Sequence, residues 1–165
     1  MSRALVIFLQ SLLAVAVLGG LFAQAVVIPT TAADEAELFP PYESVRIPLV
    51  VLAVLFVLCL QVLAVALGAM LQRAVDDAVF EPGAVTWTNV AIGAISGGGL
   101  VLAVLFVYVT FAEIPSPVDG MEVLGVWMGA GAGTVAAAGV ALLVVVGRHW
   151  LRRAIAQRVE LEHIV

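Results

Sequence analysis

The sequence predicts an all-α membrane protein built from four transmembrane helices. Of its 165 residues 64% are hydrophobic and 12% are charged, whereas a soluble domain has about 45 to 50% apolar and about 25% charged residues. The apolar residues are concentrated in four runs that are each long enough to cross a hydrocarbon core of about 30 Å as a helix. Strands of a membrane barrel would be shorter and would alternate in polarity, so the pattern indicates a helical bundle.

The four runs predict the organisation of the chain as a single domain. The expected spans are residues 4–28, 47–72, 88–112 and 122–147, followed by an amphipathic tail over residues 148–165. The link between the last two spans is about eight residues long, which makes these spans antiparallel neighbours. Ala23-Gln24-Ala25 resembles a signal-peptide cleavage site, but the apolar run continues to Pro29 and exceeds the usual h-region of about 7–15 residues. We therefore expect the first span to be retained, with cleavage as the alternative.

The arginines predict the orientation of the four spans. If the spans alternate in direction, only Arg46 lies on one side of the membrane, and the other six arginines lie on the opposite side: Arg3, Arg73, Arg148, Arg152, Arg153 and Arg158. Cytoplasmic loops carry the excess of basic residues. Both termini are therefore expected in the cytoplasm, with an acidic outer face. We expect Arg148, Trp150, Arg152 and Arg153 to anchor the end of the fourth span in the lipid headgroups.

The fourth span contains a stripe of small residues that predicts a helix-packing seam. Gly125, Gly129, Ala132, Ala136 and Gly139 recur at steps of four and three residues, which places them within about 80° of one another on a helix. Such small residues let two helices approach closely in a bilayer. We expect the seam to pack against Gly97, Gly98 and Gly99 of the third span, so that leucine is poorly tolerated at Gly129 and well tolerated at Gly131.

Polar residues inside the spans are few, and none forms a catalytic or metal-binding pattern. Gln10, Gln24, Gln61 and Asn89 are interpreted as hydrogen-bonding contacts between helices. Cys59 is the only cysteine, and the two histidines have no cysteine or carboxylate cluster around them. We therefore expect no metal, no cofactor and no enzymatic activity. Without a basic patch larger than a membrane anchor, nucleic acid is not an expected partner.

Three short motifs accompany the four spans: Val26-Val27-Ile28-Pro29, Arg46-Ile47-Pro48, and the segment from Arg73 to Phe80 that is followed by Trp87. With these motifs the chain resembles the DUF2975 family of bacterial four-helix membrane proteins. The resemblance covers nearly the whole chain. The family has no assigned biochemical function and is often encoded beside a small helix-turn-helix regulator, so the resemblance implies an architecture and a bacterial cytoplasmic membrane location, and no catalytic residues.

Three function classes fit a protein of this kind unequally. An accessory or regulatory subunit that binds membrane lipids and other membrane-protein subunits, or a second copy of itself, agrees with every feature above. A transporter or channel component is the alternative, although its pathway would normally need an ionisable residue inside the spans. A membrane enzyme would need a nucleophile with a base, or a metal cluster, and the spans contain neither.

Overall fold

The computed structural model describes residues 3–75, 82–116 and 120–162, and nearly all of them are helical. Four helices are long and apolar enough to cross a membrane, over Ala4–Leu38, Pro40–Ala74, Val85–Phe111 and Met121–Trp150. The expected all-α architecture with four spans is confirmed. The elements in chain order are α1 (Arg3–Phe22), a π-helical turn (Ala23–Val27), α2 (Ile28–Leu38), a 3₁₀ turn (Pro40–Tyr42), α3 (Glu43–Val75), α4 (Pro82–Phe111) and α5 (Met121–Glu162).

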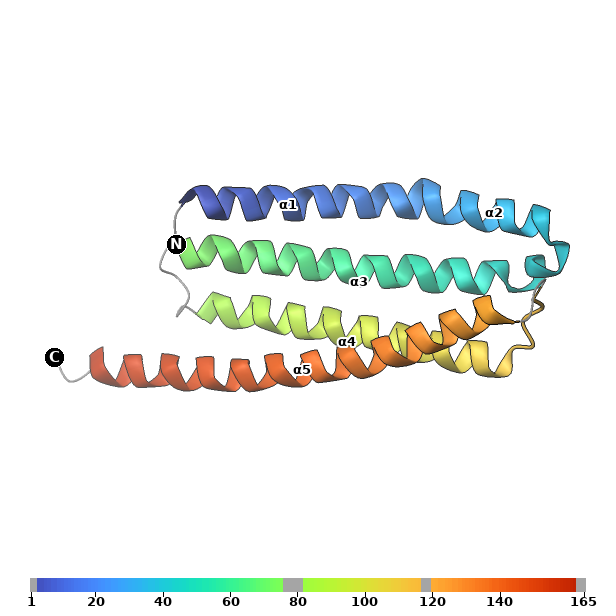
Figure 1. Ribbon diagram of the computed structural model, residues 1–165. Coiled ribbons are helices and arrows are strands. Elements are labelled where there is room, and N and C mark those ends of the chain that lie inside the picture. Colours follow the sequence, from blue (N-terminus) through green and yellow to red (C-terminus); the bar gives the residue numbers. More distant parts are fainter. Residues whose placement is uncertain (1–2, 76–81, 117–119, 163–165) are drawn as a thin grey trace.

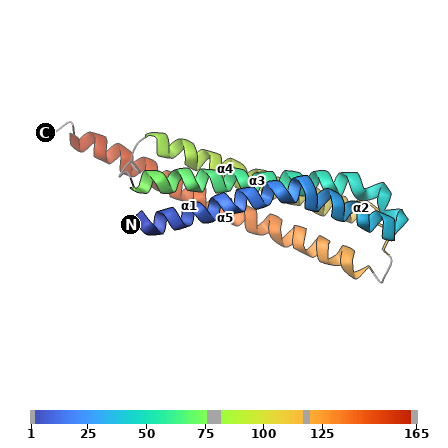
Figure 2. The ribbon, with the colours of Figure 1, turned by 90° about the horizontal axis from the view of Figure 1, so that it is seen from above.

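The helices lie in the order α1, α3, α4, α5 (Figure 1). In the described part of the chain, the main helix contacts are those of α3 with α1, α2 and α4, and that of α4 with α5. Seen from above, α5 runs obliquely to the other helices (Figure 2). Because α1 and α5 stand at the two ends of this order, each has one main neighbour and leaves much of its surface uncovered.

Successive helices alternate in direction, so the bundle has two chemically different ends. The start of α1, the end of α3, the start of α4 and the end of α5 lie together (Figure 1), and we call this the termini end. The distal end contains the 3₁₀ turn Pro40–Tyr42 and the link after α4. The antiparallel arrangement of α4 and α5 agrees with the short link between them.

The buried positions in this bundle are occupied by small side chains. The described hydrophobic residues that are buried are all alanine or valine: Val6, Ala36, Val45, Ala66, Ala91, Ala94, Val109 and Ala130. Large apolar side chains point outwards instead, among them Phe8 on α1 and Leu143 on α5. A water-soluble protein does not expose apolar surface on this scale, but a bundle surrounded by lipid must.

The helices extend beyond the expected spans at several ends. The first span continues from α1 into α2 as far as Leu38, α3 begins at Glu43 so that Pro48 lies inside it, and α4 begins at Pro82. The fourth span and part of the tail form one helix of 42 residues. Backbone chemistry favours two of these ends: proline is favoured at a helix start, as at Pro82, and Gly120, just before α5, has a φ of +70° that glycine adopts without strain.

The π-helical turn joins α1 to α2 without a break. Pro29 has no N–H to donate, and in a regular α-helix its ring would collide with the carbonyl four residues earlier. The chain widens here, so that the N–H of Ile28 donates to the carbonyl of Ala23. Beyond the turn, the Thr30 hydroxyl donates to the carbonyl of Val26 at 2.7 Å. One continuous helical span therefore replaces a helix that ends at residue 28.

Two glycines on α4 differ sharply in their surroundings. A Cβ added at Gly99 would lie 2.9 Å from the Cβ of Ala137 on α5, whereas one added at Gly93 would meet nothing within 4 Å. The Cβ of Ala137 is fixed to its backbone and cannot rotate away. At this depth the two helices are therefore as close as a glycine allows.

We expect Gly99→Ala to destabilise the protein by about 1–3 kcal/mol, because α4 and α5 must separate to make room for the methyl group. Gly93→Ala is the matched control on the same helix and should leave stability unchanged or slightly raised. Thermal unfolding in detergent measures both. Equal melting temperatures for the two variants would contradict the close contact at Gly99.

Candidate functional site

The face of α5 that packs on α4 is made of small residues that receive large side chains. Ala130 is only 2% exposed. A Cβ added at Gly131 would lie 3.1 Å from the Phe106 ring, and one added at Gly133 would lie 2.8 Å from a methyl carbon of Leu102. The glycines of this face therefore act as holes for the aromatic and aliphatic side chains of α4.

The predicted seam lies on a different face, and this corrects the expectation drawn from the sequence. All five of its residues are exposed: Gly125, Gly129, Ala132, Ala136 and Gly139. A Cβ at any of the three glycines would meet nothing within 4 Å. Helical geometry places this stripe about 140° around the axis from Ala130 and Ala137. The sequence interpretation paired small residues with small residues, whereas the structure pairs them with Phe106 and Leu102. The expected tolerance of leucine at Gly131 is therefore wrong, because Phe106 occupies that space.

An aromatic contact fixes α5 against α4 near the distal end. The rings of Phe106 and Trp127 have centroids 4.9 Å apart and are tilted by 34°. The Trp127 Nε1–H donates to the Thr110 hydroxyl at 2.9 Å, and that hydroxyl donates to the Phe106 carbonyl at 2.7 Å. Every polar group in this contact has a partner. Sequence reasoning missed it, although a tryptophan inside the fourth span and a threonine at the end of the third were the available signals.

Gly97 and Gly98 face α3 and not the predicted seam. A Cβ at Gly97 would lie 3.4 Å from the sulfur of Cys59, and one at Gly98 would lie 3.6 Å from the Cβ of the same cysteine. Gly99 alone of this glycine run contacts α5. The predicted depth of the α4–α5 contact agrees with the position of Ala137, but the helix faces that meet are different ones.

Three of the four amides singled out in the sequence join the first span to α3. Gln10 donates to the side chain of Gln72 at 2.9 Å, and Gln24 donates to the carbonyl of Val54 at 3.1 Å. Gln61 donates to the carbonyl of Val17 at 3.2 Å. Asn89 differs from them, because it is exposed on α4 and has no hydrogen bond to a described residue.

Gln61 is the most confined of these amides. Its side chain is 8% exposed, and a Cβ at Gly20 of α1 would lie 2.8 Å from its amide nitrogen. Glycine at position 20 therefore leaves the space through which the amide reaches the backbone of α1. In a bilayer, such an interhelical hydrogen bond contributes about 0.6–2 kcal/mol.

The basic end of α5 lies at the termini end of the bundle. Arg148 is half-buried, and Trp150 is 74% exposed and Arg153 is exposed. The side chain of Arg152 lies outside the described residues. The positions of these residues on one helix end agree with the expected headgroup anchor, which remains a prediction.

A cavity of about 280 Å³ opens at the distal end, where α2, α3, α4 and α5 come together. Its walls are apolar and include Val45, Leu49, Val109 and Val126. Four polar residues also line it, namely Glu35, Tyr42, Arg46 and Glu122. We call this space the distal cavity; it could not be predicted from the sequence because its lining comes from α2, the 3₁₀ turn, α3, α4, the link after α4 and α5.

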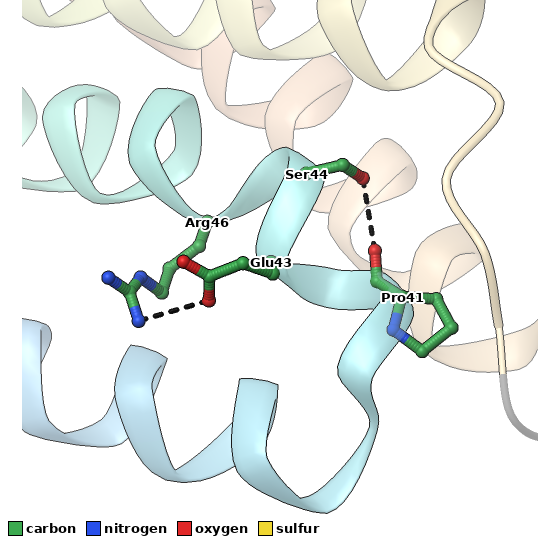
Figure 3. A network of polar contacts seen from close by, with 4 residues as sticks. All are labelled: Pro41, Glu43, Ser44 and Arg46. Carbon is green, nitrogen blue, oxygen red and sulfur yellow. Dashed lines mark hydrogen bonds and ion pairs between the residues drawn. The ribbon is translucent and has the colours of Figure 1, made fainter.

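Hydrogen bonds and one ion pair hold the polar part of the distal cavity. The Tyr42 hydroxyl donates to Glu122 Oε2 at 3.3 Å, which connects the 3₁₀ turn to α5. Arg46 forms an ion pair with Glu43 at 3.1 Å, one turn earlier on α3, and the Ser44 hydroxyl donates to the carbonyl of Pro41 (Figure 3). No group of three or more histidine, cysteine or acidic residues among the described residues is arranged to hold a metal ion.

Comparison with known families identifies the chain. A family model described as "Protein of unknown function (DUF2975)" matches residues 30–165. The chain belongs to the DUF2975 family. No curated protein and no solved structure matches it.

The DUF2975 match covers the part of the molecule that contains the contact between α4 and α5. It begins in α2 and includes α3, α4 and α5, together with the distal cavity and the exposed stripe on α5. The resemblance noted in the sequence is thus confirmed for most of the chain. Because the family is described only as one of unknown function, the match gives no chemical role to the distal cavity or to the exposed stripe.

We expect Gln61→Met to destabilise the bundle by about 0.6–2 kcal/mol, because the unbranched replacement keeps the volume but cannot donate to the Val17 carbonyl. Asn89→Leu serves as the control, since this amide has no described partner, and it should have no measurable cost. Unfolding in detergent compares the two. A larger loss for Asn89→Leu than for Gln61→Met would contradict the assignment of Gln61 as the contact between α1 and α3.

Proposed function

We propose that this DUF2975 protein is a non-catalytic membrane protein that works by helix–helix contacts with another membrane-protein chain. The observation that carries the proposal is the exposed stripe Gly125, Gly129, Ala132, Ala136 and Gly139 on α5. The bundle's own packing uses a different face of this helix, so the stripe is left free along much of the span.

The physics of bilayers supports this use of the stripe. Lipid tails are as apolar as leucine, so helices gain little by hiding large apolar side chains from lipid. Close backbone approach over glycine and alanine is the alternative source of attraction, and small-xxx-small faces provide it. The stripe has this spacing and faces lipid within one chain. A transmembrane helix of another subunit, or of a second copy, fits it.

The proposal includes an orientation in the bacterial cytoplasmic membrane. Arg73, Arg148 and Arg153 lie at the termini end, and the described basic residue of the distal end is Arg46. The positive-inside rule then puts the termini end in the cytoplasm. In this orientation the stripe lies within the bilayer and the distal cavity opens near the outer surface.

Labelling of single cysteines tests the orientation. In a Cys59→Ala background, we expect Glu37→Cys to react with a membrane-impermeant maleimide in intact cells, because α2 would face outwards. Arg153→Cys should react only after the cells are broken. The opposite pattern would reverse the orientation.

Site-specific photo-crosslinking tests the stripe. A photoreactive phenylalanine analogue at Ala136 should give a protein adduct of discrete mass in native membranes. The same analogue at Ala138 should not, because Ala138 is also exposed but lies about 200° away around the helix. The mass of the adduct distinguishes a second copy from a different subunit.

Two substitutions by leucine, one on the stripe and one away from it, supply matched variants for the crosslinking test. Ala136→Leu should abolish the adduct formed from a probe at Ala132, because the larger side chain prevents close approach. Ala138→Leu should leave the adduct intact, and neither variant should lower the melting temperature of the isolated protein. Equal adducts from positions 136 and 138, or none from either, would overturn the proposed function.

A further inference from the structure

The distal cavity combines an apolar interior with unequal charge. Its volume of about 280 Å³ is nearly twice that of an engineered apolar cavity of about 150 Å³ that takes up benzene. Ligand pockets are typically apolar enclosures with a few polar groups that orient the ligand. The distal cavity has this composition, and it is formed by all four spans.

The charges around the cavity do not balance. Arg46 already has a carboxylate partner in Glu43 at 3.1 Å. Glu35 and Glu122 also line the cavity, and neither forms an ion pair with a described basic residue. Asp34 and Glu37 lie on α2, as Glu35 does, and Glu113 follows the end of α4, so the same end of the bundle carries further acidic residues. Acidic residues therefore outnumber basic ones around the cavity.

We propose that the distal cavity binds an amphiphilic cation, with the apolar body of the ligand against Val45, Leu49, Val109 and Val126 and its ammonium group beside Glu35 and Glu122. The proposal does not depend on the stripe of α5. An anionic amphiphile would have only Arg46 to contact, and that guanidinium is already paired. A neutral one would leave both carboxylates without a counter-charge.

The geometry also explains how a ligand would reach the site. Glu35 and Glu122 are exposed, so a charged group can remain partly hydrated while the apolar part enters the bundle. The hydroxyl of Tyr42 holds Glu122 by a hydrogen bond, which fixes one carboxylate at the junction of the 3₁₀ turn and α5. Binding therefore requires no buried unpaired charge.

The test uses the full-length protein in nanodiscs of zwitterionic lipid and three probes with the same alkyl chain: octyltrimethylammonium, octanesulfonate and octyl glucoside. Each is titrated below its micelle concentration, and binding to empty nanodiscs is subtracted. We expect the cation to bind roughly five- to tenfold more tightly than the sulfonate, the preference that one or two partly exposed ion contacts provide.

Two double variants test the role of charge in binding, and one single variant tests the role of the cavity's shape. Glu35→Gln combined with Glu122→Gln should remove the preference for the cation, whereas Glu37→Gln combined with Glu113→Gln changes the net charge equally and should preserve it. Val126→Trp should weaken binding of all three probes by filling the cavity. Circular dichroism establishes that each variant is folded.

The binding results either support or overturn the cavity as a site for an amphiphilic cation. A cation preference that is lost only in the Glu35 and Glu122 variant supports the proposal. Equal or tighter binding of the sulfonate or the glucoside by the unaltered protein overturns it. Cation binding of unchanged affinity in Val126→Trp, or a cation preference that falls equally in both glutamine variants, places the effect on the general surface charge and also overturns the cavity as the site.

Discussion

Close approach between helix backbones is the constraint on which this structure depends. Helices in a bilayer cannot use the hydrophobic effect to choose one another, so contact must come from packing and from a few hydrogen bonds. The buried hydrophobic side chains of the described residues are accordingly alanine and valine. Gly20 admits Gln61, Gly99 admits Ala137 and Gly131 admits Phe106. The contacts of α1 with α3 and of α4 with α5 thus depend on positions without a Cβ.

The same constraint explains what could be predicted from the sequence. Four long apolar runs are an unambiguous signal for four spans, because hydrogen-bond satisfaction in hydrocarbon leaves the helix as the natural solution. The choice of Gln61 as a contact between helices was equally accessible, since an amide at mid-depth needs a partner. Its particular acceptor, the Val17 carbonyl, depends on the missing side chain at Gly20 and could not be read from spacing.

Helix ends and helix faces were harder to predict, for different reasons. The spans were bounded where hydrophobicity stops, but Pro29 does not end a helix when a π-helical turn accommodates it. On α5, two stripes of small residues share the same heptad spacing, one through Gly129 and Ala136 and one through Ala130 and Ala137. Only the side chains of α4, notably Phe106 and Leu102, decide between them. The distal cavity is lined by residues of six elements, and no single one of them carries a sequence pattern that indicates it.

The π-helical turn has a consequence for the first span as a whole. A π-helical turn holds one more residue than the α-helical turn that it replaces, so it shifts the angular phase of the helix by about 100°. Residues before Ala23 and after Val27 therefore do not follow one common periodicity. Gly20 and Gln10 before the turn contact α3, and so does α2 after it, an arrangement that this offset favours. Deletion of one residue from this turn would rotate one half of the span by about 100° relative to the other half. That half would turn away from α3, although the composition of the span would hardly change.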